Sequence, residues 1–120
     1  MRFFQGSGKH EYWFREGCWI TEWANEADAA DISIARARVA PGATTRWHAL
    51  AGITERYVIL SGRGRAEVGD HAIDVAPGDV VVIEPDEPQR VANTGSEDLV
   101  FLVVCTPRFR PEAYRETESG

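Results

Sequence analysis

The sequence predicts an all-β protein of a single domain, either a β-sandwich or a closed β-barrel. About nine short apolar or β-branched runs follow one another between residues 18 and 105. Turn residues such as Pro41-Gly42 and Pro77-Gly78 separate these runs, and turn signals at intervals of about eight to twelve residues are typical of sandwiches and barrels. No run shows convincing helical periodicity between residues 18 and 105, and a chain of 120 residues suits one core.

Alternation within the runs indicates which side chains share a face. Because successive side chains on a strand point to opposite sides, Arg46, His48 and Leu50 are expected on one face of their strand. Glu55 and Tyr57 are expected on one face of the next strand. The expected strands cover residues 18–23, 31–39, 44–50, 55–60, 63–68, 72–75, 80–83, 89–93 and 99–105.

The chain divides into an arm, a barrel and a tail. Residues 1–16 are too rich in aromatic side chains for a free end, so we expect an arm that packs on the barrel or on a partner subunit. Residues 17–106 form the expected barrel. Residues 107–120 form a charged tail whose last residues fray, with one possible helical stretch at residues 111–117.

Composition excludes several classes of function. The net charge is -6 and no basic face is evident, which argues against binding to nucleic acid. The N-terminus lacks the apolar core of a signal peptide, and no apolar run is long enough for a membrane span. Cys18 and Cys105 lie far apart, outside any metal-binding spacing, and are expected to be reduced thiols on strands. We therefore expect a cytoplasmic protein with no membrane association.

The candidate site is centred on His48 and Glu55, which occupy two runs joined by a short loop. If Glu55 points into a barrel, it needs a partner, because an ionised carboxylate is costly to bury alone. Three partners are open: a divalent metal shared with His48 and Gln89, the guanidinium of Arg46, or a proton retained through a raised pKa. Arg46 could also clamp a carboxylate, which makes an acidic small molecule a candidate ligand. Tyr57 could offer its hydroxyl to that ligand.

Two stretches of the chain resemble the paired motifs of the cupin superfamily, over roughly residues 31–105. The resemblance implies a double-stranded β-helix, or jelly roll, closed into a single-domain β-barrel. It also implies pairing into a homodimer, which is common among stand-alone cupins of this size. The matching positions are Gly42, His48, Glu55 and Gly62 in the first motif, and Pro77, Gly78, Asp79 and Asn93 in the second.

The resemblance implies a metal site inside the barrel with His48, Glu55 and Gln89 as ligands. Leu50 and Gln89 stand where the family pattern has histidines. Leu50 cannot bind a metal and would line a small pocket. The amide oxygen of Gln89 can bind a metal, as a glutamine does in cupin isomerases of the phosphomannose type. A nitrogen and two oxygens suit Mn, Fe, Ni or Zn, and three protein ligands leave positions open for water and substrate.

Three functions are compatible with these features. The first is a metal-dependent enzyme acting on a small molecule, such as a dioxygenase or an isomerase. The alternative is a non-catalytic ligand-binding or sensor barrel, in which Leu50 and Gln89 mark loss of the metal. The third is an interaction module, in which truncation of residues 1–16 would change association and leave the barrel intact.

Overall fold

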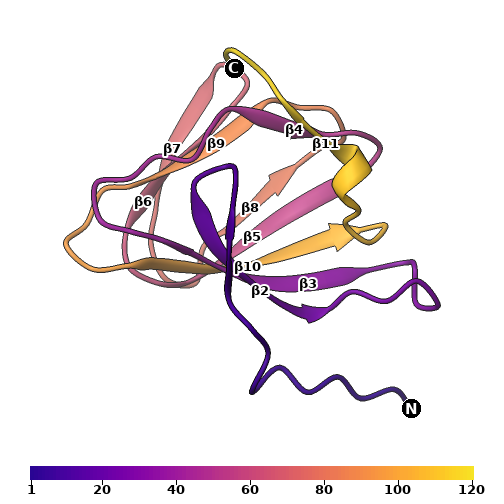
Figure 1. The fold of residues 1–120 in the computed structure, drawn as a ribbon. Coiled ribbons are helices and arrows are strands. Elements are labelled where there is room, and N and C mark those ends of the chain that lie inside the picture. Colours follow the sequence, from indigo (N-terminus) through magenta and orange to yellow (C-terminus); the bar gives the residue numbers. More distant parts are fainter.

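The computed structural model describes residues 1–120 and confirms an all-β fold with two antiparallel sheets that face each other in a barrel (Figure 1). Every named strand pair is antiparallel. Chain neighbours are often not neighbours in a sheet, because the connections cross between the two sheets, as in a jelly roll. The six-stranded sheet runs in the order β1 (Tyr12–Phe14), β2 (Cys18–Ala24), β3 (Ser33–Val39), β10 (Leu99–Thr106), β5 (Thr54–Ser61) and β8 (Val80–Ile83).

The second sheet carries the two polar strands of the candidate site side by side. In its register, His48 lies opposite Gln89. In the first sheet, Glu55 lies opposite Cys105 on one side and Ile83 on the other. The five-stranded sheet runs in the order β11 (Tyr114–Glu116), β4 (His48–Leu50), β9 (Gln89–Asn93), β6 (Gly64–Val68) and β7 (His71–Val75).

The turn between β5 and β6 explains one glycine of the motif. Gly62 has φ +84, a conformation that side-chain-bearing residues rarely adopt. A Cβ at this position would also lie 2.5 Å from the carbonyl oxygen of Asp98. This close approach brings the start of β10 against the turn and leads β6 into the opposite sheet.

The apolar core and the polar interior occupy different parts of the barrel. The larger cluster has 12 buried residues, among them Ile59, Val91 and Phe101. A second cluster of 5 buried residues includes Leu50, Cys105 and Tyr114, and borders the polar side chains. Alternation in β5 buries Glu55, Tyr57 and Ile59 on the inner face, as the pattern predicts.

Both ends of the chain contribute strands to the barrel. Part of the expected arm forms β1 and pairs with β2, and the hairpin between them crosses the front of the barrel (Figure 1). The possible helix at 111–117 is instead a single 3₁₀ turn (Pro111–Ala113) followed by β11, which pairs with β4.

No helix reaches the length and apolarity that crossing a bilayer requires. Cys18 and Cys105 are free and buried on strands, as expected. The homodimer stays a prediction.

Candidate functional site

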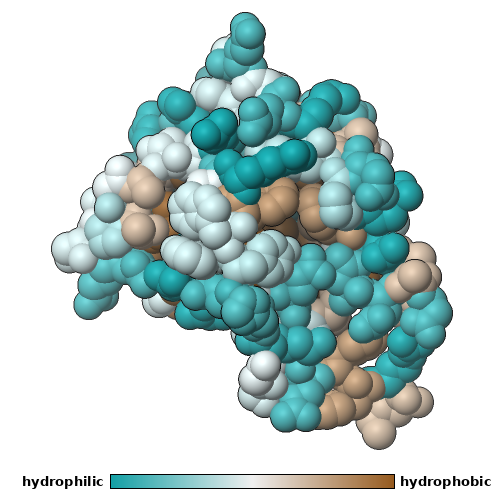
Figure 2. Space-filling model, viewed as in Figure 1, coloured by the Kyte–Doolittle hydropathy of each residue, from teal (hydrophilic) through white to brown (hydrophobic).

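A cavity opens between the two sheets beneath the β1–β2 hairpin. It holds about 520 Å³ of empty space, open mouth included, and most of its lining is hydrophobic. Figure 2 shows hydrophobic residues in a recess in the middle of this face, bordered by hydrophilic ones. The polar residues of the lining, apart from the tyrosines, are Glu16, Glu22, Asn25, Ser33, His48 and Glu55.

His48 is held in one orientation inside this cavity. Its side chain is 1% exposed, and its Nδ1 lies 2.7 Å from the carbonyl oxygen of Arg46. Because a carbonyl only accepts, Nδ1 carries the hydrogen in this contact, and Nε2 of a neutral ring keeps its lone pair. The ring also stacks on Tyr114, with centroids 5.2 Å apart and planes 23° apart. The imidazole therefore presents Nε2 to the cavity in a fixed direction.

Glu16 is the partner of that nitrogen. Its Oε2 lies 3.3 Å from His48 Nε2, and its side chain is only 15% exposed. Burial raises the pKa of the Glu16 carboxyl to about 8. The hairpin holds Glu16 in place, because its carbonyl oxygen accepts a hydrogen bond of 2.7 Å from the backbone N–H of Arg46. Sequence reasoning missed this residue, since it lies outside both motifs in the segment expected to be an arm.

Glu55 supplies a second carboxyl group to the same cavity. Burial is the main cause that raises its pKa to about 7, opposed by His48 and reinforced by the charge of Glu16. The Gln89 amide Nε2 donates a hydrogen bond of 2.5 Å to Glu55 Oε1. Of the three partners that the sequence left open for Glu55, a retained proton is the one that this environment favours.

Tyr57 and Gln89 complete a hydrogen-bonded chain that leads to Glu55. The Tyr57 hydroxyl donates to Gln89 Oε1, and the amide nitrogen of the same Gln89 faces Glu55. The amide oxygen needed for metal coordination is therefore engaged by Tyr57. No group of three or more His, Cys, Asp or Glu residues is placed to hold a metal ion. As arranged here, His48, Glu55 and Gln89 do not fit a divalent metal; coordination by Gln89 would require its amide to rotate.

The prediction for Arg46 is wrong. Its side chain is 67% exposed and its guanidinium lies 3.7 Å from Glu116, outside the cavity lining. Alternation predicted that Arg46 would share the inner face with His48, but β4 begins only at His48. In the irregular segment before it, Thr45 is the buried residue instead. Arg46 therefore neither pairs with Glu55 nor clamps a ligand, and the reason for expecting an acidic ligand is lost. Leu50 lines the cavity as expected.

Comparison with known proteins identifies the family to which the chain is related. Residues 35–105 match the family model described as Cupin domain. An uncharacterised protein of Methanocaldococcus jannaschii is 33% identical over 86 residues, which cover 72% of this chain and 66%, just under two thirds, of the relative.

Solved structures share the fold over most of the chain. Pac13, a unique nucleoside dehydratase that was also solved as a Streptomyces variant with uridine, has a TM-score of 0.81 at 13% identity, covering 99% of this chain and 92% of Pac13. A predicted oxalate decarboxylase of Thermotoga maritima has a TM-score of 0.79 at 24% identity, covering 88% and 99%. Oxalate decarboxylase of Bacillus subtilis has a TM-score of 0.82 at 20% identity, covering 94% of this chain and 31% of that one. The motif residues, the jelly-roll barrel and the match over residues 35–105 together show that this chain belongs to the cupin family.

Proposed function

We propose that this cupin domain binds a small organic molecule in its cavity and transfers protons on it, as an isomerase or as a lyase that eliminates water. The observation that carries the proposal is the contact between His48 Nε2 and Glu16 Oε2 inside the cavity, with Glu55 nearby as a second carboxyl. An acid and a base that face one bound molecule are what such reactions require.

The environments of these groups favour different roles. His48 Nε2 can accept a proton from a carbon or a hydroxyl of the bound molecule, while Nδ1–H stays on the Arg46 carbonyl. A carboxyl whose pKa is raised to about 8 or about 7 holds a proton near neutral pH and can donate it to a leaving oxygen or a neighbouring carbon. A positioned acid or base contributes roughly 10²–10⁴-fold to a rate.

Two features support an enzymatic function over ligand binding without catalysis. Buried carboxyls with strongly perturbed pKa values, gathered around a histidine in a cavity, are characteristic of active sites. Structural neighbours include a nucleoside dehydratase and an oxalate decarboxylase, so barrels of this shape do host reactions of small molecules. At these identities the neighbours say nothing about this chain's own substrate.

The test is a substrate screen on protein treated with a chelator. Small hydroxylated and carbonyl compounds are incubated with the protein in D₂O, and mass spectrometry detects uptake of deuterium or loss of water. Wild type and the surface control Asp74→Asn should react alike, while His48→Gln and Glu16→Gln should lose about 100-fold or more.

The same screen separates the alternatives. Turnover that appears only after Mn, Fe, Ni or Zn is added would contradict the metal-independent mechanism and favour the metal-dependent dioxygenase or isomerase. Compounds that bind and raise the melting temperature without reacting would favour the ligand-binding or sensor barrel. Cytoplasmic localisation is part of the proposal, supported by the free thiols of Cys18 and Cys105.

A further inference from the structure

The lining of the cavity is acidic and contains no lysine or arginine. Three carboxyl groups line it, from Glu16 and Glu55 inside and from Glu22 on β2. Arg15, Arg46 and Arg56 come near the lining residues without being part of the lining, and the Arg15 guanidinium lies over the ring of Tyr114, 4.6 Å from its centroid. An anion in this enclosed space would face acidic groups and no permanent positive charge in the lining.

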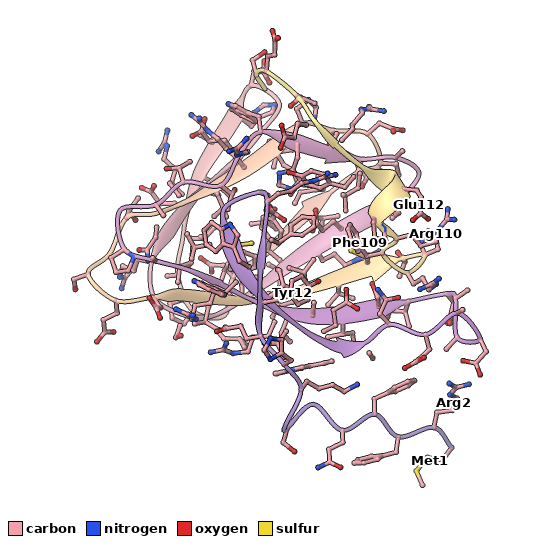
Figure 3. The ribbon with its side chains drawn as sticks, viewed as in Figure 1. Met1, Arg2, Tyr12, Phe109, Arg110 and Glu112 are labelled. Carbon is pink, nitrogen blue, oxygen red and sulfur yellow. The ribbon has the colours of Figure 1, made fainter.

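Aromatic rings form much of the rest of the wall. Phe14 meets Tyr114 edge to face at 5.0 Å and 80°, and meets Phe109 at 6.1 Å and 87°. Tyr12 stands on the other side of Glu22 and donates a hydrogen bond of 3.4 Å to its carboxylate. Figure 3 shows Tyr12 on the strand that crosses the front of the barrel and Phe109 beside the C-terminal turn. Rings set at right angles around carboxylates are the surroundings in which organic cations bind.

One polar group in this wall has no partner. Tyr114 is 6% exposed and lines the cavity, yet its buried hydroxyl makes no hydrogen bond within the protein. A buried hydroxyl left unsatisfied is destabilising, so native proteins seldom retain one without a reason. Because Tyr114 also stacks on His48, a ligand atom bonded to this hydroxyl would lie beside the imidazole.

We propose that the cavity selects a small organic cation, an ammonium compound that also carries a hydroxyl or N–H group for Tyr114. The Glu22 carboxylate attracts its charge, the rings of Phe14 and Phe109 contact its alkyl groups, and its polar group satisfies the Tyr114 hydroxyl. The inference names the substrate class of the proposed function; it rests on the cavity as the ligand site and not on proton transfer.

The test compares three probes of nearly equal shape by calorimetry. Choline carries a positive charge and a hydroxyl, 3,3-dimethylbutan-1-ol is its neutral counterpart, and 3,3-dimethylbutanoate carries a negative charge. Choline should bind at least about tenfold more tightly than the alcohol, and the carboxylate should not bind measurably.

Variants show where the selectivity comes from. Phe109→Leu keeps the wall apolar and Glu22→Gln keeps the shape of the side chain, so each should reduce the affinity for choline and leave that for the alcohol nearly unchanged. Tyr114→Phe should weaken both hydroxyl-bearing probes. Glu112→Gln, an exposed carboxylate outside the cavity lining, is the control and should bind as wild type does.

Three results would overturn the inference: equal affinity for choline and the alcohol, preference for the carboxylate, or no choline binding at tens of millimolar. Its failure is distinguishable from failure of the proposed function. Turnover of neutral compounds without cation preference would remove the substrate class and leave proton transfer standing. Choline selectivity without turnover of any compound would support the ligand class and contradict proton transfer.

Discussion

At the scale of single residues, the polar interior forms two hydrogen-bonded groups with different demands. One is the chain from Tyr57 through Gln89 to Glu55, in which both the oxygen and the nitrogen of the Gln89 amide have a hydrogen-bond partner. The other is the pair of His48 and Glu16, beside the unpartnered hydroxyl of Tyr114. The residues of the second group, His48, Glu16 and Tyr114, all line the cavity.

Two tyrosine variants should separate these roles by stability. Tyr57→Phe leaves Gln89 Oε1 buried without its donor and should lower the free energy of unfolding by about 1–3 kcal/mol. Tyr114→Phe removes a hydroxyl that has no partner and should leave the unfolding free energy unchanged or slightly higher. Urea denaturation of ligand-free protein measures both, and equal losses in the two variants would refute the distinction.

Sequence patterns place a side chain correctly only where a regular strand carries it. The inward positions of Glu55 and Tyr57 follow from the alternation of β5, whose pairing is regular from Thr54 to Ile59. Arg46 was misplaced because it precedes β4 in an irregular segment. Glu16 was missed because a hydrogen bond between segments 30 residues apart in sequence, from Arg46 N–H to Glu16 carbonyl oxygen, brings it to His48. Local periodicity carries no information about such a contact.

At the scale of elements, the first hairpin and the last strand close the cavity. Phe14 at the end of β1 packs against both Tyr114 of β11 and Phe109. The strands of the barrel body could be predicted from alternation and turn residues. The strands β1 and β11 could not, because each has 3 residues and owes its conformation to pairing with a neighbour.

Truncation should show that the hairpin belongs to the barrel. Deletion of residues 1–8 removes exposed contacts such as the ion pair of Arg2 with Asp28, and should leave stability nearly unchanged. Deletion of residues 1–16 also removes Phe14 and Glu16, and should cost about 2 kcal/mol or more and abolish ligand binding. Thermal unfolding and calorimetry of both proteins measure this. If the longer deletion changes association alone, the interaction-module hypothesis is the better one.

At the scale of the whole molecule, the buried carboxyls make stability depend on pH in an unusual direction. His48 contacts Glu16 directly, and the charge of Glu16 also acts on Tyr12, Cys18, Glu55, Tyr57, Cys105 and Tyr114. Folding raises the pKa of Glu16 to about 8 and that of Glu55 to about 7, from 4.5. The folded state therefore binds more protons than the unfolded state between these values.

The free energy of unfolding should fall as pH rises from about 5 to about 8, by up to about 1.4 kcal/mol per pH unit for each carboxyl, and level off above. Below pH 4 it should fall again, since carboxyls such as Glu11, whose pKa Arg38 lowers, lose their partners. Urea titrations across this range measure the slope. Glu16→Gln should reduce the slope and leave the contribution of Glu55, whereas Asp74→Asn should leave the slope unchanged. A wild-type slope of zero between pH 5 and 8 would contradict the assignment.

The most direct test of the acid–base site is a carbon-13 NMR titration of the glutamate carboxyl groups in chelator-treated protein. Glu16→Gln and Glu55→Gln assign the two signals. The account predicts two carboxyls with midpoints of about 8 and about 7, belonging to Glu16 and Glu55. If both signals titrate below about pH 5, like ordinary glutamates, neither residue holds a proton at neutral pH and the proposed acid–base site does not exist.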